Sequence, residues 1–241
     1  MTANYCLKVM ELLKTIESQE KASVLRIAAK MVDCINSGGI VYVFGSGHSS
    51  ILTEEAFHRA GGLIPVYPVL HGFLSPHTTP RISGKLERLE GVAPILFQRC
   101  QARPGDLFWI ASNSGVNSAA IEMAQECRKA KIDTVAVTSV AHSQSIVSRH
   151  SSGSKLFELA SFVLDNHCPP GDALTDFDGV RVGAGSTIAN AFLWNWVLTE
   201  SCNIWKQEGK ILPIYRSANL PGGDSHNEKM EMQYIQRIPL L

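Results

Sequence analysis

Short apolar runs alternate along this chain with longer stretches of helical spacing. Five runs rich in β-branched and aromatic side chains fall at residues 40–44, 63–70, 106–111, 134–138 and 161–165. Such runs are typical of strands buried on both faces of a parallel sheet. The run at 63–70 contains Pro65 and Pro68, which suit the edge of a sheet rather than its centre.

Helical spacing of apolar residues separates these runs. It predicts helices over residues 4–36, 50–60, 92–102, 116–130 and 187–207. Polar segments at 71–91, 142–154 and 167–185 read as loops, the first two with a short helical turn and the third long and rich in Pro and Gly. Alternating strands and helices predict one doubly wound α/β domain over residues 1–241. Its parts are a helix (1–37), a core (38–207) and a tail (208–241) that wraps the surface or a partner subunit.

The composition of the chain limits the classes of function that it can have. The 241 residues have a formal net charge of zero, which gives no support to nucleic-acid binding. No stretch approaches the ~20 apolar residues of a membrane helix. The chain starts without a basic segment followed by an apolar run, and its six cysteines form no C-x-x-C pair. We therefore expect a cytoplasmic protein with reduced thiols and without nucleic-acid or membrane partners.

Two loops that follow predicted central strands carry the candidate chemistry. Gly45-Ser-Gly-His-Ser-Ser50 follows the run at 40–44, and Ser112-Asn-Ser-Gly-Val-Asn-Ser118 follows the run at 106–111. Glycine lets the backbone approach a ligand closely, and free N–H groups at a helix start favour an anion. If the two strands are neighbours, the loops meet at a topological switch point.

A dinucleotide site is disfavoured, because Ser50 stands where the fingerprint needs a third glycine and no acid ends the second strand. A single phosphate group suits the loops better.

These paired loops resemble those of the sugar isomerase (SIS) domain family, which includes phosphoheptose isomerase and N-acetylmuramic acid 6-phosphate etherase. The segments Glu54-Glu-Ala-Phe-His-Arg-Ala-Gly-Gly62 and Pro169-Pro-Gly-Asp-Ala173 are similar to a single-domain bacterial branch related to phosphoheptose isomerase. The resemblance implies phosphate binding by Ser49, Ser112, Ser114 and Asn117, and Ser118 is the alternative to Asn117. We extend the predicted phosphate site to the neighbouring loop residues Ser46, Gly47, His48 and Asn113.

The sequence determines the catalytic residues less closely than the phosphate-binding residues. Glu54 and His58 stand four residues apart, so on a helix they share a face as an acid–base couple, as two metal ligands or as a solvent-exposed ion pair. Aligned with phosphoheptose isomerase, the family's functional helix positions fall on Glu55 and Arg59. We predict Glu55 as the base, assisted by His58, Glu54 or His71, and Arg59 as a substrate contact. Asp172, Ser186 and Thr187 either border the pocket or cap turns and helices. Glu87 and Glu90 are read as a solvated helix face, although the resemblance implies that acids from nearby segments can also serve in such enzymes.

Together these patterns predict a three-layer αβα sandwich with a flavodoxin-like, five-stranded parallel sheet of order 2-1-3-4-5. The predicted function is aldose–ketose isomerisation of a phosphorylated sugar in a homodimer or homotetramer, without metal or cofactor. The alternatives are a lyase (etherase) or deglycase acting on phosphosugars, and a non-catalytic phosphosugar-binding regulator.

Overall fold

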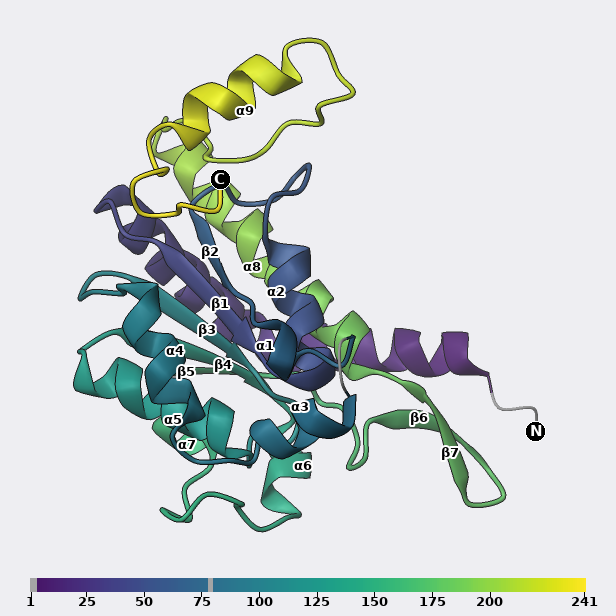
Figure 1. Ribbon diagram of the computed structural model, residues 1–241. Coiled ribbons are helices and arrows are strands. Elements are labelled where there is room, and N and C mark those ends of the chain that lie inside the picture. The colour runs from purple at the N-terminus through teal and green to yellow at the C-terminus, as the bar shows by residue number, and fades with distance from the viewer. Residues whose placement is uncertain (1–3, 78–79) are drawn as a thin grey trace.

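The computed structural model describes residues 4–77 and 80–241, which are built on a five-stranded parallel sheet (Figure 1). Its strands lie in the order β2-β1-β3-β4-β5, as predicted, and every neighbouring pair is parallel. Their bounds are β2 Val66–Val69, β1 Val41–Gly45, β3 Leu107–Ala111, β4 Asp133–Thr138 and β5 Phe162–Asp165. The central pair, β1 and β3, therefore ends in the two polar loops at the same edge of the sheet.

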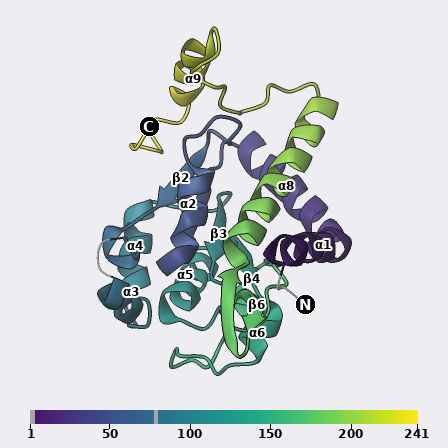
Figure 2. The same ribbon diagram turned by 90° about the vertical axis from the view of Figure 1, so that its right-hand side faces the viewer.

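Helices cover both faces of the sheet, giving the three layers visible in Figure 2. On one face, Val43 and Trp109 pack against α1 (Tyr5–Asn36), α2 (Ser50–Ala56) and α8 (Ser186–Gln207). On the other, Tyr42 and Phe108 pack against α4 (Val92–Cys100), α5 (Ser118–Lys129) and α7 (Leu156–Leu159). Because successive side chains alternate between two buried faces, the strands read as unbroken apolar runs.

The helix after β1 is shorter than predicted. The turn η1 (Gly47–Ser49) leads into α2, which ends at Ala56 rather than near residue 60. Phe57 is extended and packs against both apolar clusters, and His58 follows with φ of 47°. The predicted helical face shared by Glu54 and His58 is therefore wrong. The remaining short helices are η2 (Gly72–Leu74), α3 (Pro80–Leu86) and α6 (Val140–Gln144).

The segment 167–185 is not simply a loop. It contains an antiparallel hairpin of β6 (Ala173–Phe177) and β7 (Val180–Ala184), which extends from the body of the molecule (Figure 1). Asp178 and Gly179 form its turn with φ values of 52° and 90°. An Asp-Gly pair with two positive φ angles is typical of a type I′ hairpin turn.

The tail lies at the opposite end of the sheet from this hairpin (Figure 1) and includes a further helix, α9 (Gly223–Glu231), that the sequence pattern did not indicate. Its Arg237 forms a two-pronged ion pair with the buried Asp106, with Nη1–Oδ1 and Nη2–Oδ2 distances of 3.0 and 2.8 Å. In the described ranges, no helix has the length and apolar character needed to cross a bilayer.

Candidate functional site

A cavity of about 370 Å³ lies at the carboxyl edge of the sheet, where the loops after β1 and β3 meet. Helix α3, the start of α6 and the hairpin's flanks complete its wall. Its described lining residues are Ser46, Gly47, His48, Ser49, Pro76, Pro80, Ser83, Gly84, Glu87, Ser112, Asn113, Ser114, Asn117, His142, Asp172 and Ser186. Eight of the nine residues predicted to hold a phosphate are therefore on one cavity wall.

The loop after β1 folds back sharply on itself, and Gly45 makes this possible. A Cβ at Gly45 would lie 2.5 Å from the carbonyl carbon of Ser49 and 2.9 Å from the amide nitrogen of Ser50. The close approach positions Ser46, His48 and Ser49 along the cavity. The Ser49 hydroxyl makes no hydrogen bond within the described chain, so it is available to a ligand.

The loop after β3 is held by its own polar side chains. The Ser112 hydroxyl accepts a hydrogen bond from the Gly115 amide at 3.2 Å, and Gly115 has φ of 61°. Asn113 accepts a hydrogen bond from Asn166 at 3.0 Å. The Ser114 hydroxyl, like that of Ser49, has no partner among the residues described.

Glu87 connects the two loops. Its Oε2 accepts a hydrogen bond from the Ser46 hydroxyl at 3.1 Å, and its Oε1 accepts one from the Asn117 amide at 3.0 Å. Burial raises the pKa of Glu87, although the hydrogen bond from Ser46 and the positive charges of Arg88 and Arg149 oppose this. A half-buried carboxyl with a raised pKa in a polar cavity is a candidate acid–base group.

Sequence reasoning missed Glu87. Its segment, Lys85-Leu-Glu-Arg-Leu-Glu90, has the charge pattern of a solvated helix face, but α3 ends at Leu86 and Glu87 turns into the cavity. The helix-face interpretation is therefore wrong for this residue. Only the tertiary approach of α3 to the two loops reveals its position.

His142 also lines the cavity and was not predicted. Its Nδ1 is buried and has no hydrogen-bond partner within residues 4–77 and 80–241. Burial lowers the pKa of His142, Arg149 lowers it further, and Asp172 opposes the change. The imidazole is therefore neutral over a wider range of pH than an ordinary histidine.

Asp172 and Ser186 close the cavity near the hairpin. Asp172 Oδ2 accepts a hydrogen bond from the Ser186 hydroxyl at 2.7 Å, and Oδ1 accepts one from the Ser186 amide at 2.8 Å. Asp172 thus caps the start of α8 and also lines the cavity. Asp172 therefore both caps the helix and borders the cavity, so the two alternatives stated for it do not exclude each other.

The predicted base, Glu55, lies in an adjoining smaller cavity of about 100 Å³ between α2 and α8. This cavity shares His48, Ser49 and Ser186 with the first and also contains the predicted Thr187. Glu55 pairs with Arg59, and both face a shallow outer hollow with Glu54. The Glu55–Arg59 pair is therefore next to the main cavity rather than within it.

Three predicted residues lie outside the described lining of both cavities and of the outer hollow. His58 contacts Glu231 at 3.2 Å, and His71 stacks on Phe73 beyond β2. Ser118 is completely buried, and its hydroxyl donates to the Arg88 carbonyl at 2.9 Å. Asn117 caps the start of α5, which leaves Ser118 within the helix and turned away from the ligand space.

Comparison with known proteins gives consistent results. A family model described as SIS domain matches residues 4–139. A UPF0309 protein of Geobacillus kaustophilus is 38% identical over 243 aligned positions, covering 100% of this chain and 97% of the relative. A phosphoheptose isomerase structure from Francisella tularensis has a TM-score of 0.53 at 15% identity, covering 84% of this chain and 95% of that one. The Vibrio vulnificus NanR protein, solved with ManNAc-6P, has a TM-score of 0.50 at 16% identity, covering 98% and 68% respectively.

Proposed function

Since this chain belongs to the SIS domain family, we propose that it binds a phosphorylated sugar in the cavity between the β1 and β3 loops and isomerises it between aldose and ketose forms. The observation that carries the proposal is Glu87, a carboxyl of raised pKa hydrogen-bonded to both hydroxyl-rich loops. It places a proton-transfer group directly beside the candidate phosphate site.

The phosphate group is assigned to the free hydroxyls of Ser49 and Ser114 and to backbone N–H groups of the two loops. Each hydrogen bond to a charged acceptor contributes about 1.5–3 kcal/mol net. Three or four such bonds supply roughly 5–12 kcal/mol, compared with about 8 kcal/mol for micromolar binding. Contacts to the sugar must offset the cost of ordering the ligand. A cavity of about 370 Å³ falls within the size range of small-molecule sites.

The chemistry requires two proton movements. A base removes the proton from the carbon next to the carbonyl and returns it to the adjacent carbon, while a second group moves a proton between the two oxygens. We assign the carbon proton to Glu87 and the oxygen proton to His142, whose lowered pKa keeps a neutral imidazole available. Glu55, in the adjoining cavity, is the alternative base.

The two carboxylates can be separated by experiment. Glu87→Gln keeps a hydrogen-bonding side chain but removes the base, so it should lose turnover of the accepted sugar phosphate and retain binding. Glu55→Gln serves as the matched variant and should keep most of the turnover. Isomerisation is followed by NMR of a panel of aldose and ketose phosphates, and binding by calorimetry.

Each outcome has a distinct meaning. Full turnover by Glu87→Gln with loss in Glu55→Gln would transfer the base to Glu55. Binding without turnover in the wild type would leave a phosphosugar-binding protein and contradict isomerisation. No binding of any phosphorylated sugar would contradict the proposed function altogether.

We also propose that the protein self-associates. Exposed apolar side chains gather where the start of α1 meets the hairpin, which the hydrogen bond from the Tyr5 hydroxyl to the Ala184 carbonyl holds together at 2.7 Å. They include Leu7 and Met10 on α1 and Phe177, Val180 and Val182 on the hairpin. Light scattering coupled to size-exclusion chromatography should give at least a dimer mass, and a monomer at every concentration would contradict this.

A further inference from the structure

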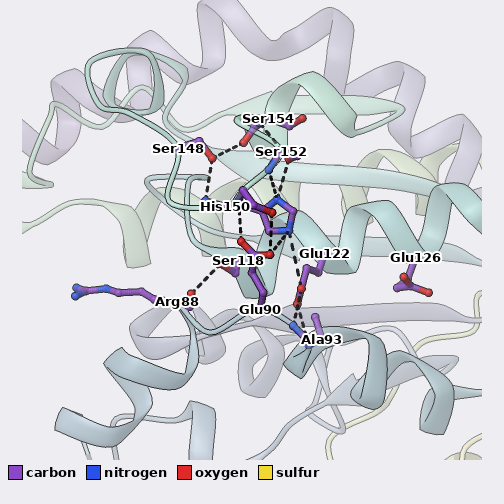
Figure 3. A network of polar contacts seen from close by, with 12 residues as sticks. Arg88, Glu90, Ala93, Ser118, Glu122, Glu126, Ser148, His150, Ser152 and Ser154 are labelled. Atoms are coloured by element: carbon purple, nitrogen blue, oxygen red, sulfur yellow. Dashed lines mark hydrogen bonds and ion pairs between the residues drawn. The ribbon is translucent and has the colours of Figure 1, made fainter.

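A second group of titratable side chains lies outside both cavities. Glu90, Glu122 and His150 converge from the segment after α3, from α5 and from the segment before α7 (Figure 3). His150 Nε2 lies 3.9 Å from Glu90 Oε2 and 3.9 Å from Glu122 Oε1. The three candidate ligand atoms all lie within 4.8 Å of one another.

Hydrogen bonds hold each side chain in this orientation, and they include the two glutamate oxygens that face His150. Glu122 accepts hydrogen bonds from the Gly91 and Ala93 amides at 2.6 and 3.4 Å. Glu90 accepts bonds from the amide and hydroxyl of Ser151 at 2.7 and 2.8 Å. His150 Nδ1 lies 2.8 Å from the Ser152 hydroxyl.

The Nε2 atom of His150 faces the two carboxylates. Its Nδ1 accepts a hydrogen bond from the Ser152 amide at 3.1 Å and lies 2.8 Å from the Ser152 hydroxyl, so without a metal ion the ring proton lies on Nε2. Binding of a metal ion at Nε2 would move this proton to Nδ1, where the Ser152 oxygen can accept it. Metal-binding histidines commonly donate their other ring N–H to an oxygen in this way. Within the described chain, Nε2 makes no hydrogen bond, although the His150 side chain is only 8% exposed.

The charges of the group are not balanced by the protein. The Glu122 side chain is 9% exposed, and in the described residues neither glutamate forms an ion pair with Lys or Arg. The Arg88 side chain extends away from the group in Figure 3. Two neighbouring carboxylates around a neutral imidazole lack a compensating cation. This is costly for the buried Glu122, whereas Glu90 is 44% exposed and its ionised form is stabilised by the hydrogen bonds from Ser151.

We propose that Glu90, Glu122 and His150 bind a divalent first-row transition-metal ion, with zinc(II) as the reference case. One imidazole nitrogen with two carboxylate oxygens suits these ions better than magnesium or calcium, which prefer all-oxygen sites. Ligand bonds of about 2.0–2.2 Å in tetrahedral geometry place ligand atoms about 3.4 Å apart. The two 3.9 Å separations need to shorten by only about 0.5 Å.

With three protein ligands such an ion would keep a further position for water, and it would lie close to the sugar-phosphate cavity. It would join the segment carrying His150 to α5 and to the start of α4. Arg149, the preceding residue, donates to Asn117 in the cavity wall at 2.7 Å. Glu90 likewise follows Glu87 by three residues. The metal site itself does not depend on the proposed isomerase function.

The test uses untagged, chelator-treated full-length protein titrated calorimetrically with zinc chloride and, separately, with manganese chloride. We expect one high-occupancy site per chain and a higher thermal transition with zinc. Glu90→Gln and His150→Asn should each weaken binding at least about tenfold. Glu126→Gln removes the same charge one turn further along α5, where the side chain contacts Lys129, and should bind zinc like the wild type.

The remaining outcomes decide against the site. Absence of zinc and manganese binding by the wild type would overturn it, as would equal binding by all three variants. Zinc binding lost on replacing the exposed Cys6 by Ser would assign the metal to that thiol instead.

Discussion

The close turn at Gly45 offers a direct test of the phosphate site. Gly45→Ala would place a methyl group 2.5 Å from the Ser49 carbonyl carbon, whereas carbon atoms in contact normally lie about 3.5 Å apart or more. Because the obstructing atoms are backbone, the loop itself must move by roughly 1 Å. That movement displaces the Ser49 hydroxyl and the backbone N–H groups assigned to the phosphate.

The expected loss of affinity follows from hydrogen-bond geometry. A displacement of about 1 Å stretches a bond of about 2.9 Å beyond the useful range. Losing two bonds to a charged ligand costs about 3–6 kcal/mol, or roughly a hundredfold to ten-thousandfold in Kd. Overpacking should also lower the free energy of unfolding by about 1–3 kcal/mol, which leaves most domains of this size folded.

Thermal unfolding with and without the sugar phosphate measures both effects. At a ligand concentration about 100 times Kd, the wild type gains about 2.7 kcal/mol, equivalent to a Tm increase of roughly 5–11 °C. Gly45→Ala should show a lower Tm and almost no ligand shift at that concentration.

Gly84→Ala is the matched control, since it adds the same methyl group to the lining of the same cavity. Nothing lies within 4 Å of a Cβ at Gly84, so this variant should bind normally. Wild-type affinity in Gly45→Ala would refute the assignment of the phosphate to this loop. Equal loss in both variants would attribute the effect to cavity filling rather than to loop displacement.

Three further outcomes are expected. If Glu87 is the base, the acid limb of the wild-type kcat/KM profile should lie above the pH expected for an ordinary glutamate, because its pKa is raised, and Glu87→Gln should remove turnover. Asp106→Ala should lower the free energy of unfolding by about 3–5 kcal/mol in urea titrations, because it leaves Arg237 without its buried partner. The hydrogen bond that His167 Nε2 donates to Glu20 raises the pKa of His167, so its stabilisation is complete below about pH 6.5 and is lost as pH rises through the raised value. Unfolding measured across this range should therefore be less pH-dependent in Glu20→Gln than in the wild type.

The sheet and its two loops were predictable because they depend on local pattern. Residues 40–44 and 107–111 are apolar on both faces, and each run is followed by glycine and hydroxyl residues. Parallel neighbours must end at the same edge, so the meeting of the loops follows from the strand order. The hairpin could also have been predicted from the sequence, since Asp178-Gly179 is a strong turn signal between β-branched residues.

The proton-transfer groups were not predictable in the same way. Glu87 and His142 occupy segments with ordinary exposed-loop composition, and only the packing of α3 and α6 over the sheet edge brings them to the cavity. The error at His58 has a related cause. Packing of Phe57 into the apolar clusters ends α2 at Ala56, before the helical register can reach His58.

The charge of the cavity leads to a final prediction. Among its described lining residues are the carboxyl groups of Glu87 and Asp172 and no Lys or Arg, so neutral donors must supply most of the phosphate affinity. A phosphate dianion beside Glu87 would raise the pKa of this carboxyl further, since like charges disfavour ionisation. Binding should therefore take up protons, and affinity should increase as pH falls towards the pKa of Glu87. Calorimetry in two buffers of different ionisation enthalpy measures the proton uptake, and Glu87→Gln removes the contribution of the carboxyl while leaving that of the phosphate. Equal uptake by both proteins would mean that the phosphate does not lie beside Glu87, and would require a different orientation of the ligand in the cavity.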